Sequence, residues 1–254
     1  MSNDFPVKLW IDACLKIADQ AGLEILRVYR QEDFGQKPKD DKSPVTDADF
    51  AANRVIVAAL QLLTPDIAIV SEEEKDKPQG HRVFWLVDPL DGTREFIKRN
   101  DEFTVNIALV CDGKPILGVI TAPALSLAYV GGVGVVAQRR DANGDWIQIE
   151  VSYIKGQTIK IAGSKNYHSD ASKHWIAQNH PNAEVLGVGS SLKFCMIAEG
   201  TVQFYPRFGR TMEWDTAAGQ AILAAAGGRV TTLDNNILLY GKPNFENPDF
   251  LARY

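Results

Sequence analysis

Apolar residues recur at steps of three and four along the start of the chain, which predicts one long amphipathic helix. A second helix is predicted from Thr46 to about Leu63, because Thr46 can cap its first turn and Asp49 stands in the capping-box position. A polar, lysine-bearing loop at 36–44 separates the two helices. The apolar face of the first helix consists of Trp10, Cys14, Ile17, Ala21, Ile25 and Val28.

Short apolar runs and alternating patterns replace the helical spacing from residue 67 onward, and they predict strands. The turn signal Asp112-Gly113 joins two of these strands into a hairpin, and Asn143-Gly144 joins another two. The predicted strands are 67–70, 83–87, 103–110, 115–122, 133–138 and 146–151.

Strands alternate with helices after about residue 155, which predicts a second α/β layer packed on the first. We expect an N-terminal α+β lobe at 1–154 and a C-terminal α/β lobe at 155–254, with a site in the cleft between them. The predicted elements are strands at 158–162, 184–188, 202–205 and 229–232 and helices at 171–179, 191–199 and 216–226.

The composition is that of an ordinary globular protein, with 45% hydrophobic and 23% charged residues among 254, so intrinsic disorder is excluded. A net charge of −5 argues against a nucleic-acid polymer or a polybasic membrane anchor as partner. The uncharged stretch 118–138 is long enough to cross a bilayer, but Pro123 and several glycines indicate strands broken by a turn. No transmembrane segment is therefore predicted.

Two further features favour a cytoplasmic location. The N-terminal residues show no apolar core of the kind that a signal peptide has. The three cysteines lie far apart in apolar runs, which indicates buried thiols in a reducing compartment rather than a disulfide or zinc framework. These cysteines are Cys14, Cys111 and Cys195.

The run Asp-Pro-Leu-Asp-Gly-Thr at 88–93 places two carboxylates at the end of a buried strand. The proline favours an extended conformation at Asp88, and Gly92 permits a tight turn, so Asp88 and Asp91 can point into one small volume. Two carboxylates this close repel each other unless a cation lies between them. With the Leu90 carbonyl they offer hard oxygen ligands that suit Mg²⁺, and a helix beginning near the glycine could bind phosphate.

Three other acids have ordinary structural explanations when each is taken alone. Glu72 belongs to a glutamate run after a short strand, which is most often a solvated loop end. Asp215 precedes a helical pattern and is by default an N-cap, and Asp49 has the capping-box role given above. Glu72, Asp215 and Asp49 become candidate site residues only together with Asp88 and Asp91. The Asp-Gly pair of the 88–93 run also has an ordinary explanation, because it is common as a simple turn.

The run at 88–93, taken with Trp-Asp-Thr-Ala-Ala-Gly at 214–219, resembles the two signature motifs of the inositol monophosphatase superfamily of Mg²⁺-dependent, lithium-sensitive phosphatases. That resemblance implies a layered αβαβα sandwich like the inositol monophosphatase and fructose-1,6-bisphosphatase fold, with two lobes and the site in the cleft. The extended form of the first motif and four further segments are similar to one branch, the CysQ-type 3′(2′),5′-bisphosphate nucleotidases. The extended form is 88–100, and the segments are 102–108, 189–195, 198–200 and 205–208.

The resemblance implies a role for each matching residue. Asp49, Glu72 and Thr93 would be catalytic, with Thr93, backed by the two acids, holding the attacking water in line. Two or three Mg²⁺ ions would be bound by Glu72, Asp88, the Leu90 carbonyl, Asp91 and Asp215. Substrate would be bound by Leu90, Asp91, Gly92, Thr93, His168, Ser190, Lys193, Arg207 and Asp215.

A second phosphate on the substrate would need cations, and the resemblance assigns Lys193 and Arg207 to it. The geometry of a guanidinium suits Arg207 to this task. Ordinary explanations exist for both residues, because a lysine on a helix is most often a surface charge and Pro206-Arg207 is often a loop.

The function implied by the resemblance is hydrolysis of the 3′-phosphate of 3′-phosphoadenosine 5′-phosphate to AMP and phosphate by direct attack of a metal-bound water, in sulfur assimilation. Its sulfated relative, 3′-phosphoadenylyl sulfate, is a second candidate substrate. The resemblance also implies a monomer or a homodimer, and it alone allows peripheral attachment to the cytoplasmic face of the inner membrane.

Two alternatives remain open from the sequence. The chain could be an inositol, fructose or histidinol phosphatase on the same scaffold, since a fold does not fix a substrate. Arg94-Glu95-Phe96 stands where many inositol monophosphatases have Thr-Asn-Phe, which disfavours inositol phosphate. A more distant alternative is a non-catalytic protein that binds metal and regulates a partner.

Overall fold

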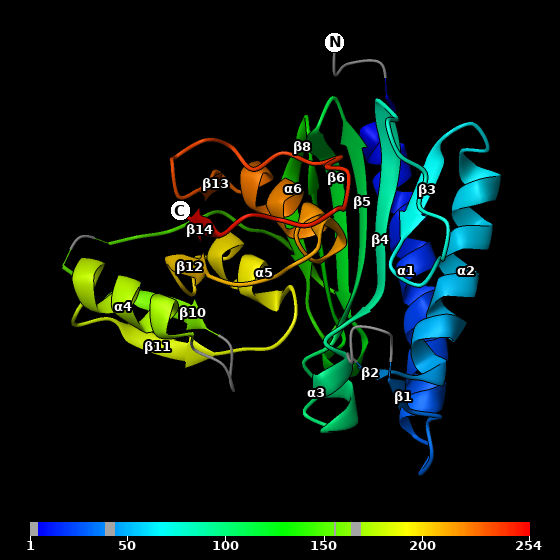
Figure 1. Cartoon of the computed structure of the whole chain (residues 1–254), viewed down its shortest axis with the longest axis horizontal. Coiled ribbons are helices and arrows are strands. Elements are labelled where there is room, and N and C mark those ends of the chain that lie inside the picture. Colours follow the sequence, from blue (N-terminus) through cyan, green and yellow to red (C-terminus); the bar gives the residue numbers. More distant parts are fainter. Residues whose placement is uncertain (1–4, 39–43, 155, 164–168) are drawn as a thin grey trace.

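The computed structural model describes residues 5–38, 44–154, 156–163 and 169–254. Two β-sheets and the helices around them form five layers (Figure 1). Helices α1 (Val7–Tyr29) and α2 (Asp47–Leu63) form one outer layer, and α4 (Asp170–Asn179) forms the other. Helices α5 (Leu192–Ala198) and α6 (Ala217–Ala225) lie between the sheets. This order confirms the αβαβα sandwich.

The larger sheet has seven strands in the order β3-β4-β5-β6-β7-β8-β9. Its strands pair antiparallel with their neighbours, except that β3 runs parallel to β4. Its strands are β3 (Ala68–Ser71), β4 (Val83–Asp91), β5 (Thr104–Cys111), β6 (Lys114–Ala122), β7 (Leu127–Gly132), β8 (Val135–Arg140) and β9 (Trp146–Gln148). The short helix α3 (Thr93–Ile97) connects β4 to β5.

The smaller sheet has five strands in the order β11-β10-β12-β14-β13. It mixes parallel pairs around β10 with antiparallel pairs around β14. The strands are β10 (Lys160–Gly163), β11 (Glu184–Gly187), β12 (Phe204–Arg207), β13 (Arg229–Thr232) and β14 (Phe250–Arg253). A small ribbon of β1 (Lys37–Pro38) and β2 (Pro44–Val45) and the 3₁₀ turns η1 (Pro123–Leu125) and η2 (Glu213–Asp215) complete the described elements.

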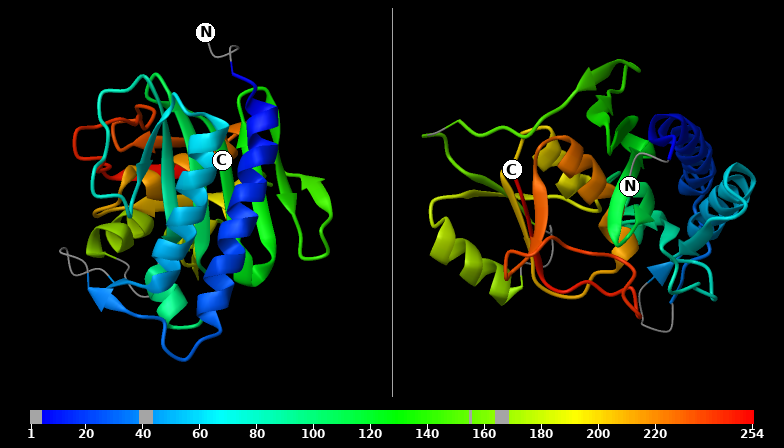
Figure 2. Two further views of the ribbon diagram at one scale, coloured as in Figure 1. Left: turned by 90° about the vertical axis from the view of Figure 1, so that its right-hand side faces the viewer. Right: turned by 90° about the horizontal axis from the view of Figure 1, so that it is seen from above.

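Both faces of the larger sheet are covered by helices, which explains the continuous apolar runs in its central strands. Helices α1 and α2 lie side by side across one face (Figure 2), and their apolar stripes bury Ile25 and Ile56 in one core that also holds Trp85 of β4. The other face packs on α6, and Phe194 of α5 and Ile222 of α6 belong to a second core shared with the smaller sheet. One core thus holds the outer helices on the larger sheet, and the other holds the two sheets on the middle layer of helices.

The sequence located most elements to within a few residues. Thr46 caps α2, and the predicted capping box with Asp49 is present, since Asp49 Oδ2 accepts from Thr46 N at 2.7 Å. The predicted strand at 133–138 corresponds to β8, preceded by a separate strand, β7, within the uncharged stretch. Strand β14 was not predicted, yet it lies between β12 and β13 and completes the smaller sheet.

The division into lobes at 154 and 155 stays a prediction, and Lys155 lies outside the described residues. Cys14, Cys111 and Cys195 are free buried thiols, as the sequence predicted, and burial raises the pKa of each. Among the helices of the described residues, none combines the length and apolar character that crossing a bilayer requires.

Helix α6 approaches the larger sheet so closely that Gly118 of β6 has no room for a side chain. A Cβ at this position would lie 2.3 Å from the carbonyl oxygen of Ala218. We expect Gly118→Ala to lower the free energy of unfolding by about 2 kcal/mol, measured by urea denaturation, because the helix backbone must move.

A matched control is Gly22→Ala in the middle of α1. The new methyl group would meet a side-chain carbon of Pro123 at 3.0 Å, while alanine improves the helix propensity. We expect the free energy of unfolding of this variant to stay within about 1 kcal/mol of the wild type. Equal losses in the two variants would contradict the close approach of α6.

Candidate active site

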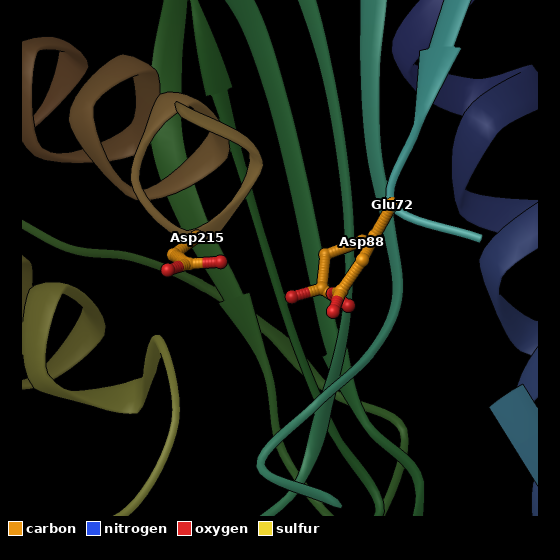
Figure 3. Close-up of side chains that lie close together, drawn as sticks. All are labelled: Glu72, Asp88 and Asp215. Atoms are coloured by element: carbon orange, nitrogen blue, oxygen red, sulfur yellow. The ribbon is translucent and has the colours of Figure 1, made fainter. Parts of the chain in front are cut away.

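Three acidic side chains from separate parts of the chain meet between the sheets. Glu72, Asp88 and Asp215 each offer a carboxylate oxygen, and these atoms all lie within 4.8 Å of one another. Figure 3 shows Glu72 and Asp88 side by side at the edge of the larger sheet, with Asp215 facing them from the start of the α6 segment. Acids distant in sequence therefore converge as the sequence predicted.

The end of β4 fixes Asp88 and Asp91. The pairing with β5 is regular up to Asp88, opposite Asn106, and the register then shifts before Asp91, opposite Thr104. Asp88 is buried, and its Oδ1 accepts a hydrogen bond from Leu90 N at 3.0 Å. Asp91 lines the same cleft as the three clustered acids. Its role as a metal ligand stays a prediction.

Glu72 follows β3 and continues its pairing with β4, because Glu72 N donates to the Val87 carbonyl at 3.1 Å. A buried network fixes the backbone on either side of it. Ser71 Oγ donates to Asn53 Oδ1 at 2.7 Å, and Asn53 Nδ2 donates to Glu74 Oε1 at 2.7 Å. Glu72 is thus placed by rigid neighbours and is not a solvated loop end.

Asp215 ends the turn η2, and its Oδ2 accepts from Met212 N at 2.8 Å. Glu213, two residues before Asp215, is fully buried and accepts hydrogen bonds from Gly241 N at 2.7 Å and Lys242 N at 2.9 Å. The Lys242 ammonium lies 2.6 Å from the same carboxylate. Glu213 thus holds the turn that carries Asp215 against residues 241 and 242. The sequence before Asp215 did not predict this role for Glu213.

Thr93 and Asp49 form a second polar pair beside the carboxylate cluster. Thr93 Oγ1 lies 3.2 Å from Asp49 Oδ1 and 3.4 Å from the Leu90 carbonyl. Asp49 is buried behind Thr93, and its other oxygen binds Thr46. Asp49 therefore both caps α2 and reaches Thr93, so its two sequence interpretations are compatible.

The acids of the cleft repel one another in the absence of a cation. Burial, with the nearby Glu95 and Glu72 carboxylates, raises the pKa of Asp91 to about 6, although Lys193 opposes this change. Burial and the negative charges of Asp91 and Glu72 also raise the pKa of Asp215 well above its usual range. A divalent cation fits this set, because it would be bound by hard oxygen donors and would relieve the repulsion.

The cleft has a volume of about 340 Å³, and positive groups line it together with the acids. Lys193 is 7% exposed, so it is not the surface lysine that its helix position would suggest. Its ammonium donates to the carbonyls of Val188 at 3.2 Å and Ser190 at 2.6 Å. Burial lowers the pKa of Lys193 to about 8, against the attraction of Asp91, which still leaves it mainly charged near neutral pH.

The other predicted substrate residues also line the cleft, apart from one. Arg207 lies at the end of β12, and its guanidinium donates to the Arg210 carbonyl at 3.0 Å. Ser190 has a φ of +49°, which is rare for a residue with a side chain. His168 lies outside the described residues. Leu90, Gly92, Thr93 and Asp215 complete the predicted set within the cleft.

Clustered carboxylates, a paired threonine and a cationic wall in one cleft are the parts of a metal-dependent phosphatase site. The sequence profile of the inositol monophosphatase family matches residues 8–252, and the chain belongs to this family.

Particular relatives are similar over nearly the whole length. The chain is 45% identical over 252 residues to the 3′(2′),5′-bisphosphate nucleotidase CysQ of Escherichia coli O6:H1, which covers 94% of this chain and 98% of that protein. The crystal structure of CysQ from Bacteroides thetaiotaomicron superposes with a TM-score of 0.85 at 35% identity, covering 99% and 98% of the two chains. Inositol monophosphatase from Anabaena superposes with a TM-score of 0.78 at 25% identity, covering 98% and 92%.

The raised pKa values predict how metal binding depends on pH. Because folding raises the pKa of Asp91 from 3.8 to about 6, the metal-free protein loses stability as the pH rises through this window, and Asp215 acts in the same direction. A divalent cation removes this penalty once the acids are ionised. We therefore expect Mg²⁺ to raise Tm by about 4 °C more at about pH 8 than at about pH 5, measured by scanning calorimetry.

Potassium chloride at equal ionic strength is the control, because it screens charge without binding in the cluster. A thermal shift that is the same at both pH values, or that the control salt reproduces, would contradict binding at the buried acids.

Proposed function

We propose that this protein is a Mg²⁺-dependent phosphatase that hydrolyses the 3′-phosphate of 3′-phosphoadenosine 5′-phosphate to AMP and phosphate. The observation that carries the proposal is one cleft whose lining combines clustered acids with two cationic side chains, Lys193 and Arg207. The carboxylate cluster of Glu72, Asp88 and Asp215 suits the phosphate that is cleaved. Lys193 and Arg207 supply positive charge for a second phosphate. The similarity to nucleotidases named CysQ favours the same substrate class.

Mg²⁺ fits the donor set, because Glu72, Asp88, the Leu90 carbonyl, Asp91 and Asp215 would offer only oxygen. When bound, the metal would neutralise phosphate charge and lower the pKa of water. We propose that these five residues hold two or three ions.

Thr93 and Asp49 would orient the attacking water. When Thr93 Oγ1 donates its proton to Asp49 Oδ1, a lone pair of the hydroxyl remains to accept from water. As the water oxygen forms its bond to phosphorus, the bond from phosphorus to the 3′-oxygen breaks. One proton of the water is released and balances the proton that the leaving oxygen takes up, and the other stays on the phosphate. Phosphoryl transfer of this kind depends mainly on position and charge neutralisation. The proposed catalytic residues are Asp49, Glu72 and Thr93.

The residues Leu90 to Thr93 would contact the cleaved phosphate, because they line the cleft together with the clustered acids. Ser190, Lys193 and Arg207 would contact the rest of the nucleotide. Lys193 also lies 5.3 Å from the centre of the Tyr205 ring, so its ammonium is held between an aromatic face and two carbonyls. A cation held in this way can bind an anionic group without reorganising.

A substrate panel tests the proposal. Phosphate release is measured from 3′-phosphoadenosine 5′-phosphate, 3′-phosphoadenylyl sulfate, inositol 1-phosphate, fructose 1,6-bisphosphate and histidinol phosphate, each with Mg²⁺, EDTA or Li⁺. We expect the highest kcat/KM with the bisphosphate nucleotide, loss of activity in EDTA and inhibition by Li⁺. Preference for inositol, fructose or histidinol phosphate would overturn the proposed substrate. Release from none of them would favour a non-catalytic metal-binding protein.

We also propose that the protein acts in the cytoplasm. The support is its three free, buried thiols, Cys14, Cys111 and Cys195, since a reducing compartment keeps such thiols unpaired. Cell fractionation tests this proposal. We expect the protein in the cytosolic fraction, and recovery with washed inner membranes would instead indicate peripheral attachment.

A further inference from the structure

Residues 188–191, the crossing segment, join β11 to α5 and bring the C-terminal half of the chain against the turn that follows β4. Gly189 and Ser190 line the cleft, and Lys193 is the second residue of the helix α5 that follows the segment. Ser190 holds a φ of +49°, so the segment adopts a backbone conformation that it would rarely choose alone. Contacts from the rest of the fold must therefore hold it.

One such contact comes from Glu102, in the loop between α3 and β5. Its Oε2 accepts a hydrogen bond from Gly189 N at 2.8 Å. The Gly189 N–H and the Val188 carbonyl belong to one peptide plane, and that carbonyl accepts from Lys193 Nζ at 3.2 Å. A single peptide group thus connects the Glu102 carboxylate on one side with the Lys193 ammonium on the other.

The packing around this contact leaves no room for adjustment. A Cβ on Gly189 would lie 2.5 Å from Glu95 Cγ and 2.9 Å from the Glu102 carbonyl oxygen. A Cβ on Gly92, whose φ is +94°, would lie 3.1 Å from the same oxygen. Glu102 is therefore packed between the turn of the metal-binding acids and the crossing segment.

A second link joins the crossing segment to the larger sheet. Ser191 Oγ lies 2.7 Å from Asn106 Oδ1 and 2.8 Å from Thr104 Oγ1, and all three side chains are buried. Asn106 Nδ2 in turn lies 3.5 Å from Asp91 Oδ2. This link fixes the end of the segment at Ser191, so Glu102 is left to set the peptide group between Val188 and Gly189.

Glu102 is itself held by an ordered loop. Its backbone N–H donates to Asn100 Oδ1 at 3.2 Å, and the neighbouring Phe103 is buried against Phe96 and Tyr29. The Tyr29 hydroxyl lies 2.9 Å from Asp101 Oδ1. The Glu102 carboxylate is thus ordered before substrate binds, so substrate binding does not lose free energy in ordering it.

We propose that Glu102 is a positioning residue for the second phosphate: by fixing the peptide group between Val188 and Gly189, it places the Lys193 ammonium relative to the metal-binding acids. The proposal rests on the function proposed above. It assigns the main effect of Glu102 to hydrogen-bond reach, since the carboxylate accepts from a backbone N–H. The negative charge of Glu102 also favours the protonated form of Lys193, but it is the smallest of the influences on the pKa of that group.

Two substitutions separate reach from charge. Glu102→Asp keeps the negative charge but shortens the side chain by one methylene group, so the carboxylate can no longer reach Gly189 N. Glu102→Gln removes the charge but keeps an oxygen at the same reach. The matched control pair is Glu184→Asp and Glu184→Gln, because Glu184 is an exposed carboxylate on β11, just before the segment.

Steady-state kinetics are measured with 3′-phosphoadenosine 5′-phosphate and with 3′-AMP, which lacks the second phosphate. We expect Glu102→Asp to raise KM for the bisphosphate about tenfold, the loss expected for a hydrogen bond to a charged group, with kcat changed less than about threefold. KM for 3′-AMP should stay within about threefold of the wild type, as should all constants of Glu102→Gln and the control pair.

Hydrogen–deuterium exchange of the peptides covering 188–193 gives a readout that does not depend on activity. We expect faster exchange at the Gly189 amide in Glu102→Asp but not in Glu102→Gln. Unchanged KM and exchange in Glu102→Asp, or equal damage in both variants, would overturn the positioning role. Failure of the proposed function would appear instead in the wild type, as no phosphate release from the bisphosphate, and the exchange result would still decide the role of Glu102.

Discussion

Asp88→Asn is expected to lower kcat by at least about 10³-fold, the largest effect of any substitution considered for this protein. Asp88 is buried and lies among the carboxylate oxygens that include Glu72 and Asp215. Asparagine keeps the size of the side chain and an oxygen that can accept from Leu90 N, but it removes the charge. The loss should therefore fall on metal-dependent phosphate hydrolysis and not on the fold.

Steady-state rates with the bisphosphate nucleotide measure this effect, and Tm is measured alongside them. Asp66→Asn is the matched control, because Asp66 is an exposed aspartate in the turn between α2 and β3. The control should keep wild-type kcat. A folded Asp88→Asn variant with near wild-type turnover would remove the basis for placing metal at this cluster.

Lys193→Met is expected to lower kcat/KM for the bisphosphate nucleotide about 100-fold, as the loss of a buried, hydrogen-bonded charge at a binding site predicts. Methionine fills most of the space of the buried stem, so packing in α5 is largely kept. The ammonium that it replaces is held by the Val188 and Ser190 carbonyls and is attracted by the Asp91 carboxylate. Hydrolysis of 3′-AMP, which lacks the second phosphate, should fall much less.

The comparison of the two substrates is the test, and it does not depend on the absolute rate. Lys160→Met provides the control, since Lys160 is half-exposed on β10 and pairs with Glu184 at the surface. It should leave both substrates unaffected. An equal loss on the bisphosphate and on 3′-AMP would show that Lys193 serves the fold or the cleaved phosphate, and not the second phosphate.

The fold was largely predictable because its elements carry strong local patterns. Apolar periodicity located α1 and α2, and turn signals such as Asp112-Gly113 located the hairpins of the larger sheet. The pairing of β14 was not predictable, because a four-residue strand near the C-terminus is defined by its neighbours β12 and β13 and not by its own pattern.

The acids of the site were predictable for a different reason. The 88–93 run combines a strand end, a proline and a glycine, and the two carboxylates that it places in one turn would repel each other without a cation. Asp49 shows the limit of such reasoning, because a capping box explains the residue fully at the level of sequence. The pairing of this carboxylate with Thr93 was implied by the family resemblance alone, and the structure shows the contact.

The residues that support the site could not be found from the sequence. Glu213 and Glu102 accept hydrogen bonds from backbone groups that are distant along the chain, at Gly241 and Gly189 respectively. Nothing in the local pattern around a glutamate indicates such a contact, because it depends on how separate layers pack. Burial of Lys193 has the same origin, since its helix lies between the two sheets.

Crystals grown with Mn²⁺ test the central claim most directly, because Mn²⁺ takes the same hard oxygen ligands as Mg²⁺ and is seen by its anomalous scattering. The account predicts at least one anomalous peak within bonding distance of carboxylate oxygens from Glu72, Asp88 and Asp215. No peak in the cleft, or a peak held by other residues with these three carboxylates unbound, would contradict it.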